Sequence, residues 1–396
     1  ASEKSYGLAR NLCLLLSVGQ RAIVMDDDVL CSAMISPHCR EGLQFATTSP
    51  EVDFYESEQD ILARNRLADF DPLTGHAQCL GLSLAQAVKK LGVQKLEPQH
   101  LQGANAAYLN HWSADSPILV TQAGTLGDPG TGDLRWIYTL DSNSTRRLLE
   151  SPGGLDGALK KRHYWSGQPM PTFSKMAVIS QTTGLDNSHL LPPYFPIFRG
   201  EDYLFGAMTE YLHPQGVTLD YAWSVLHFPL EQRSGGAEKT PASGKGKFNP
   251  SKYVTDRTLY HKGLSVQTRL QGLVQMITAL GEASDRELLT QYRTEAAEGL
   301  ATTMSRLNLK LQVAQELPVE WQTYLQQSIG NISQAMQSPA RPEDMLTTGE
   351  TTDVLLGIFR GYCLEFGAAL AGWEAIREKA QEVSEVMLEA GQLTPL

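Results

Sequence analysis

The sequence predicts a protein of two parts, an α/β domain with a mixed sheet flanked by helices and then an all-helical domain. In the first part, helical patterns alternate with short apolar runs typical of strands, most clearly where residues 6–18 lead through Gly19 into 22–25. In the last third of the chain, apolar residues recur only at helical spacing. A stretch rich in Gly, Ser and Lys separates the two parts and is typical of a flexible linker. The predicted α/β domain, linker and helical domain are 1–235, 236–250 and 251–396.

Composition indicates a globular protein and argues against one class of binding partner. The 396 residues carry 33 Lys and Arg against 44 Asp and Glu, a net charge of −11, which argues against a nucleic-acid partner. Hydrophobic residues make up 42% of the chain, enough for a large core. Five scattered cysteines form no disulfide pattern, no apolar run approaches the ~20 residues of a membrane span, and no secretion signal is recognisable. We therefore expect a cytoplasmic protein with reduced thiols and no transmembrane segment.

The elements of the first domain follow in order from apolar spacing and from turn residues. Residues 6–18 predict a helix, and the run Ala22–Met25 predicts a buried strand that leads directly into three aspartates. Residues 148–200 form a long irregular segment with several prolines, which is typical of a binding loop. The remaining predicted elements are strands at 43–47, 118–121, 217–223 and 225–228 and helices at 58–66, 83–91 and 203–211.

The second domain is predicted to be a set of long helices without an internal repeat. An apolar stripe from Leu355 to Trp373 on the last of them predicts either a core face or an interface. We therefore expect these helices to pack back on the first domain or to join two copies into a homo-oligomer. Their predicted ranges are 264–280, 285–309, 319–336 and 353–388.

The strongest chemical signal is the apolar strand that ends in three aspartates. Consecutive carboxylates repel one another unless a cation or hydrogen-bond donors offset the repulsion. Asp26 and Asp28 at the carboxyl end of a strand would form a hard oxygen site suited to Mg²⁺ or Mn²⁺. The alternative is a solvated acidic turn, but the apolar strand before it favours the metal site.

Two later positions carry further candidate groups. Glu201 and Asp202 begin a predicted helix, where carboxylates either complement the helix dipole or supply a base for a substrate hydroxyl. His227 ends an apolar strand and is either a core residue or a metal ligand. Two arginines are candidates for a contact to phosphate, Arg199 and Arg233.

Together these motifs resemble the GT-A class of nucleotide-sugar-dependent glycosyltransferases. The resemblance covers roughly residues 5–235: a strand ends in Asp-x-Asp, a Gly-Glu-Asp helix start follows some 175 residues later, and a strand-end His follows about 25 residues after that. It implies a GT-A-like, Rossmann-like sheet and the transfer of a sugar from a nucleotide-sugar donor to a hydroxyl acceptor. It also implies a bacterial role in polysaccharide or glycoconjugate synthesis.

The resemblance assigns roles to the candidate residues. Asp26 and Asp28 would hold Mn²⁺ or Mg²⁺ at the donor diphosphate, with Asp28 as a direct ligand and His227 as a further one. Asp202, next to Glu201, would be the base that deprotonates the acceptor, which leads to inversion. The donor would also lie against Asp27, Arg199 and Arg233, and two aromatic residues would stack on a sugar ring, Tyr164 and Trp165.

Two alternatives remain open. The first resembles the haloacid dehalogenase phosphatases, with Asp26 as the nucleophile, Asp28 as the acid and base, and Gly127-Asp128 as a later metal motif. Leu30 argues against it, because that family prefers Thr or Val there. The second is an inactive glycosyltransferase-like binding module. Only 25 residues precede Asp26, so the nucleotide-binding portion of the GT-A class is expected to be short or missing, whereas the intact acids favour an enzyme.

Overall fold

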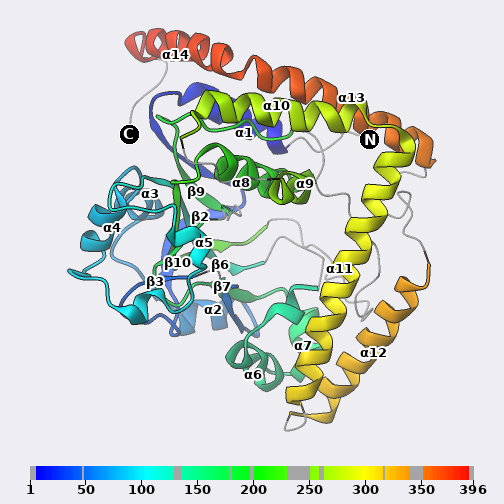
Figure 1. Cartoon of the computed structure of the whole chain (residues 1–396). Helices are drawn as coiled ribbons and strands as arrows, with labels where there is room; N and C mark the ends of the chain where they lie inside the picture. The colour runs from blue at the N-terminus through cyan, green and yellow to red at the C-terminus, as the bar shows by residue number, and fades with distance from the viewer. Residues whose placement is uncertain are drawn as a thin grey trace.

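The chain forms a mixed α/β fold with a helical C-terminal region. A mixed sheet of ten strands carries helices on both faces, and long helices cover its top and one side in the view of Figure 1. The computed structural model describes residues 6–46, 49–128, 135–175, 177, 181–196, 200–229, 250–257, 263–314, 317–338 and 351–391.

Strands β1, β6 and β10 of the sheet point in the same direction. The main path of the sheet runs β1-β9-β6-β10-β2-β5. Strand β10 is parallel to β6, while β9 is antiparallel to both β1 and β6, so β1, β6 and β10 place their carboxyl ends at one edge. The strands are β1 (Arg21–Met25), β2 (Val29–Ile35), β3 (Gln44–Phe45), β4 (Glu51–Phe54), β5 (Arg66–Leu67), β6 (Ile118–Gly127), β7 (Tyr164–Gly167), β8 (Thr172–Ser174), β9 (Thr182–Asp186) and β10 (Val217–His227).

Helices pack on both faces of this sheet. One face buries side chains of α1, α8 and α14, and the other buries side chains of α4 and the His76 ring of α3, which packs against Trp223. Side-chain caps fix several helix starts; Ser83 and Gln86 form a capping box at α4, for example. The helices are α1 (Tyr6–Leu16), α2 (Glu58–Arg64), α3 (Pro72–Ala77), α4 (Leu84–Lys90), η1 (Pro98–Leu101), α5 (Ala106–Leu109), η2 (Arg135–Thr139), α6 (Ser142–Glu150), α7 (Gly154–Lys160), α8 (Glu201–Leu212), α9 (Pro250–Asp256), α10 (Val266–Glu282), α11 (Asp285–Val313), α12 (Val319–Met336), α13 (Thr352–Ala371) and α14 (Trp373–Glu389).

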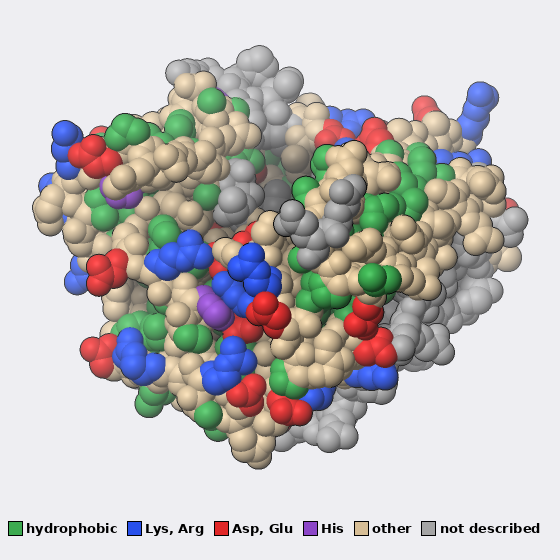
Figure 2. Space-filling view, turned by 90° about the horizontal axis from the view of Figure 1, so that it is seen from below, with side chains coloured by type: hydrophobic (Ala, Val, Ile, Leu, Met, Phe, Trp, Pro, Cys, Tyr) green, Lys and Arg blue, Asp and Glu red, His purple; other side chains and the backbone are tan. Residues whose placement is uncertain are grey.

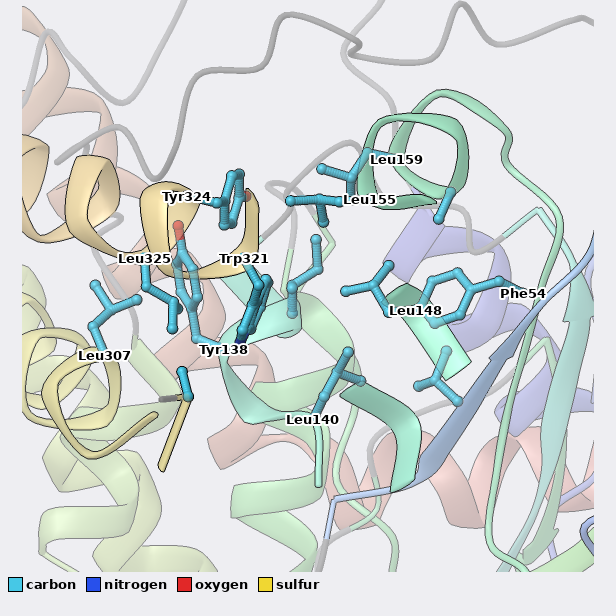
Figure 3. Packing of buried hydrophobic residues seen from close by; sticks show 14 of the residues in the cluster. Phe54, Tyr138, Leu140, Leu148, Leu155, Leu159, Leu307, Trp321, Tyr324 and Leu325 are labelled. Atoms are coloured by element: carbon cyan, nitrogen blue, oxygen red, sulfur yellow. The ribbon is translucent and has the colours of Figure 1, made fainter. Parts of the chain in front are cut away.

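The C-terminal helices share hydrophobic clusters with the first part of the chain. In one cluster, α11 and α12 pack against β4, η2, α6 and α7 (Figure 3). In a second, α9, α10 and α13 pack against α8. Polar bonds reinforce the first contact, because Lys310 of α11 donates to the carbonyl of Leu140 and Tyr138 donates to Ser328 of α12. The segment at η2 is therefore held between the sheet and the C-terminal helices.

Helix α13 is the one described helix that is long and apolar enough to cross a membrane by length and composition, with a mean hydropathy of 1.5. Its buried side chains, among them Leu356, Phe366 and Leu370, belong to the cluster shared with α8 and α10. This packing fits a core helix and agrees with the prediction of no transmembrane segment.

The elements differ from the predictions in several places, and the short elements β4, β5, α3 and α6 were not predicted. Residues 148–200 were expected to be irregular, but they contain α7, β7, β8 and β9. These strands have three to five residues, too few for an alternating pattern to stand out. Strand β2 was not predicted, because exposed Leu30 and Cys31 break its alternation. The last predicted helix is two helices, since Gly372 caps α13 and α14 begins at Trp373.

The surface charges are mixed in sign. On the face shown in Figure 2, basic and acidic side chains lie among one another and around histidine. Ion pairs elsewhere in the described residues also join opposite charges, including exposed Arg40 with Glu51 and exposed Arg64 with buried Asp53. Such an alternating surface differs from the basic patch that binds nucleic acid.

Candidate active site at the carboxyl ends of three strands

Residues far apart in the sequence meet at the edge where β1, β6 and β10 end. Asp26 directly follows β1, Asp128 directly follows β6, and His227 is the last residue of β10. Pairing locks two of these ends together, because Gly127 lies opposite His227 and the amide of Asp128 donates to the His227 carbonyl over 3.0 Å. The aspartates predicted from β1 and the histidine predicted from β10 therefore share one site.

The ring of His227 lies between two hydrogen-bond acceptors. His227 is 2% exposed, its Nδ1 contacts the backbone oxygen of Asp128, and its Nε2 lies 3.0 Å from Oδ1 of Asp28. A carbonyl oxygen only accepts, so Nδ1 carries the proton that it donates. In the neutral ring, Nε2 then turns a lone pair toward a carboxylate. Two acceptors at this distance require a proton or a cation between them.

Arg10 of α1 joins Asp26 to the start of α8. Its Nη1 lies 2.8 Å from Oε1 of Glu201, and its Nη2 lies 3.4 Å from Oδ1 of Asp26. Burial raises the pKa of the Asp26 carboxyl above its usual value, the Arg10 charge lowers it again, and neighbouring Asp28 adds to the rise. No role was predicted for Arg10, although its helix leads into the predicted metal motif. A basic residue within a mostly apolar helix was the available signal.

Glu201 and Asp202 begin α8 immediately after Gly200, whose φ is +97°. Both carboxylates accept backbone N–H groups at the helix start, Glu201 from Gly200 over 3.0 Å and Asp202 from Tyr203 over 2.9 Å. These bonds match the helix-dipole interpretation, and the Arg10 contact adds a tie to the strand ends. Burial, followed by the charge of Glu201, raises the pKa of Asp202. A raised pKa makes a carboxylate a stronger base.

Asp128 is held by Arg162 through two hydrogen bonds of 2.6 and 2.8 Å. Gly127 before it has a φ of +122°, and a Cβ there would lie 2.4 Å from the His227 carbonyl oxygen. Only glycine permits this close approach of the two strand ends. Asp128 thus fixes the Nδ1 side of His227, while Asp28 faces the Nε2 side.

The other predicted residues lie outside this contact set. Asp27 is exposed in the turn after β1. Trp165 is fully buried and donates from its indole to Ser224 over 3.0 Å, so it is a core residue rather than a platform for a sugar. Two predicted phosphate contacts fall outside the described residues, Arg199 and Arg233.

The predicted metal ligands come together only in part. Asp28 and His227 are in contact, whereas the carboxylate of Asp26 faces Arg10. Within the described ranges, no group of three or more His, Cys, Asp or Glu side chains is arranged to hold a metal ion. Any cation held here would therefore need ligands from a substrate or from water.

Comparison with known proteins places the chain in no family. No protein-family model, no curated protein and no solved structure matches it. The chemistry of the site itself is thus the basis for a functional argument.

Proposed function

We propose that this chain is a metal-dependent glycosyltransferase that moves a sugar from a nucleotide-sugar to a hydroxyl acceptor with inversion. One observation carries the proposal: His227 donates from Nδ1 to a backbone carbonyl and turns Nε2 toward Asp28 at 3.0 Å. Histidines that bind metals commonly donate their other N–H to a carbonyl or carboxylate, which orients the ring. The pair is thus prepared for a cation.

The residues fit a cation that is shared with a substrate. Mg²⁺ at phosphate sites usually takes one or two protein ligands and completes its shell with water and phosphate oxygens. Asp28 and His227 would hold Mg²⁺ or Mn²⁺ in this way, with Asp26 as the further ligand that the GT-A resemblance adds. The bound ion would supply Lewis-acid stabilisation of a departing diphosphate.

Asp202 suits the role of the base that accepts the acceptor's proton. Its carboxyl has a raised pKa, and Arg10 links its neighbour Glu201 to Asp26. Arg10 therefore keeps the start of α8 beside the strand-end acids, so a hydroxyl and a diphosphate would be held at the same edge. Cytoplasmic synthesis of a polysaccharide or glycoconjugate remains the biological setting that we propose.

Calorimetric titration with nucleoside diphosphates and nucleotide-sugars, with and without Mn²⁺, tests the proposal. We expect the wild-type chain to bind only with Mn²⁺, and Asp28→Asn to lose that binding because the ligand charge is removed. Asp27→Asn is the matched control, since it removes the same charge one residue away from an exposed side chain.

Equal binding by both variants would overturn the role of Asp28. No nucleotide binding by the wild type would overturn the glycosyltransferase proposal. A generic phosphatase assay would then separate the phosphatase alternative from an inactive module.

A further inference from the structure

A pocket of about 250 Å³ opens beside the site at the edge of β6 and β7. Its wall includes the ends of two strands and the η2 segment, which α11 and α12 hold in place. Ten residues line it: Ser49, Pro50, Val52, Thr125, Gly127, Trp136, Thr139, Leu140, Tyr164 and Ser166.

The pocket adjoins the acid cluster through two of its own residues. Gly127 lies opposite His227 in the β6–β10 pairing, and it also lies opposite Tyr164 in the β6–β7 pairing. The hydroxyl of Thr125 donates to the side chain of Gln181, whose backbone oxygen accepts the amide of Asp26 over 2.9 Å. A molecule in the pocket would therefore lie next to the strand ends that carry the carboxylates.

The lining is neutral and amphipathic. Among the described residues, no charged side chain lines the pocket, so an anionic ligand such as a phosphate finds no counter-charge from them. Trp136 and Tyr164 supply aromatic surface, and Val52 and Leu140 add aliphatic surface. Four of the lining residues carry aliphatic hydroxyls, which can donate as well as accept: Ser49, Thr125, Thr139 and Ser166. Such a mixture suits a ligand with apolar C–H faces and a rim of hydroxyls.

The two aromatic rings favour a puckered ligand over a flat one. Their centroids lie 5.3 Å apart, and their planes are tilted by 57°. A planar base stacks fully on only one of two rings tilted in this way, whereas a chair-shaped ring has faces that contact both. The volume lies below the roughly 300–1,000 Å³ of pockets for drug-sized ligands, which limits the occupant to about one ring.

We propose that this pocket binds one neutral pyranose ring of the sugar substrate. The proposal rests on the proposed function and deepens it, because the pocket would set which sugar is accepted. Trp136 would cover a C–H face of the ring, and the Ser and Thr hydroxyls would bind its hydroxyl groups.

Ligand-observed saturation-transfer NMR on the full chain tests the pocket directly. The probes are methyl glucoside, methyl galactoside, methyl mannoside and uridine, without metal or nucleotide. We expect saturation on the ring C–H protons of at least one hexoside, with a dissociation constant of about 1 mM, as ligand efficiency implies for a single small ring. Trp136→Leu should weaken this binding about tenfold, because the aromatic wall is lost.

Two variants make the result specific. Trp112→Leu is the matched control, since Trp112 is also a half-buried indole but does not line the pocket. Ser166→Ala removes a lining hydroxyl with almost no change in volume, and we expect it to alter the preference among the three hexosides. Circular dichroism on each variant verifies that it is folded.

The outcomes separate this inference from the proposed function. Hexoside binding that persists in Asp28→Asn and fails in Trp136→Leu supports the pocket independently of the metal site. Uridine binding that depends on Trp136 would overturn the sugar assignment, and so would the absence of hexoside binding at about 20 mM. In either case, the calorimetric titration of Asp28→Asn with Mn²⁺ and nucleotide would still test the proposed function separately.

Discussion

At the scale of single residues, the positive charge of the Arg10 guanidinium offsets the negative charge of two carboxylates in the site. Arg10 is 14% exposed and contacts two carboxylates that belong to segments some 175 residues apart. Removing the guanidinium would leave buried Glu201, at 6% exposed, without its cation and would remove the positive charge beside Asp26, at 40% exposed. The attraction to these two carboxylates offsets the free-energy cost of desolvating the half-buried Arg10 guanidinium.

We expect Arg10→Met to lower the free energy of unfolding by about 2 kcal/mol and to raise the pKa of Asp26 further. Denaturant unfolding measures the first effect. Arg21→Met is the control, because Arg21 is exposed and donates only to the carbonyl of Gly81 over 3.3 Å. A similar loss in both variants would show that Arg10 contributes no more than a surface arginine.

Asp202→Asn should abolish transfer and yet stabilise the fold. The folded-state pKa of Asp202 lies above its unfolded value, so the folded protein holds this proton more tightly and loses stability as the pH rises through the folded pKa. At neutral pH the ionised carboxylate is therefore a net cost, which an amide removes. We expect the melting temperature to rise by about 1 °C.

The opposite sign is expected for Asp141→Asn, which serves as the control. The side chain of Asp141 accepts hydrogen bonds at the start of α6, and its pKa is lowered in spite of burial, chiefly by the bonds from Ser144. Differential scanning calorimetry at pH 7 compares the two variants. In the wild type, transfer activity should fall on the acid side at a higher pH than an ordinary aspartate would give.

At the scale of elements, the close approach of β6 and β10 sets the position of His227. Gly127→Ala would press a methyl group against the His227 carbonyl and the ring of Phe228 at a φ of +122°. We expect a loss of about 3 kcal/mol in stability and weaker Mn²⁺-dependent nucleotide binding. Gly92→Ala is the control, since its φ is +86° but no atom lies within 4 Å of the added methyl group. Calorimetric melting and titration measure both effects, and equal results for the two variants would contradict the steric argument.

Elements with a strong local pattern could be predicted from the sequence, and those defined by pairing could not. Apolar strand β1 and the capped helix α4 carry their own signals, such as Ser83 before the helix. Strands β7, β8 and β9 exist because they pair with β4, β6, β10 and β1, and three to five residues contain too little pattern to predict that.

The same distinction holds within the site. Asp26, Asp28 and His227 stand at strand ends and could be predicted from their place in the local pattern. Arg10 and the Arg162 that binds Asp128 owe their roles to contacts between distant segments. Whether Asp202 serves as a base stays a prediction until transfer is assayed.

At the scale of the whole molecule, α14 anchors the helical region to the sheet. Arg377 is 5% exposed and donates to the carbonyls of Asn187 over 2.9 Å and His189 over 2.8 Å. Near it, the indole of Trp373 donates to the carbonyl of Leu191 over 2.7 Å. These bonds add donors to backbone carbonyls of the segment after β9, where the carbonyls of Asn187 and His189 also accept the amides of Gly19 and Leu191.

Arg377→Met should therefore lower the free energy of unfolding by about 3 kcal/mol, since it removes the three hydrogen bonds that a buried guanidinium donates to Asn187 and His189. Lys379→Met is the control, because Lys379 is exposed and its ion-pair partner among the described residues is Glu382, which is also exposed. We expect one cooperative calorimetric transition in the wild type, as the shared hydrophobic clusters require. Two separate transitions would indicate that the predicted domains unfold independently.

The two hydrogen bonds that hold the η2 segment against α11 and α12 have a consequence for how such a protein diversifies. Lys310 and Ser328 hold the loop that presents Trp136 and Thr139 to the pocket, yet neither belongs to the sheet that carries the carboxylates. Substitutions on the outer helices can then reshape the wall of the proposed sugar pocket and leave the carboxylates at the strand ends in place. The residues that would select the sugar and the residues that would carry out its transfer then lie in different stretches of one chain. The first set can change in sequence while the second set stays the same.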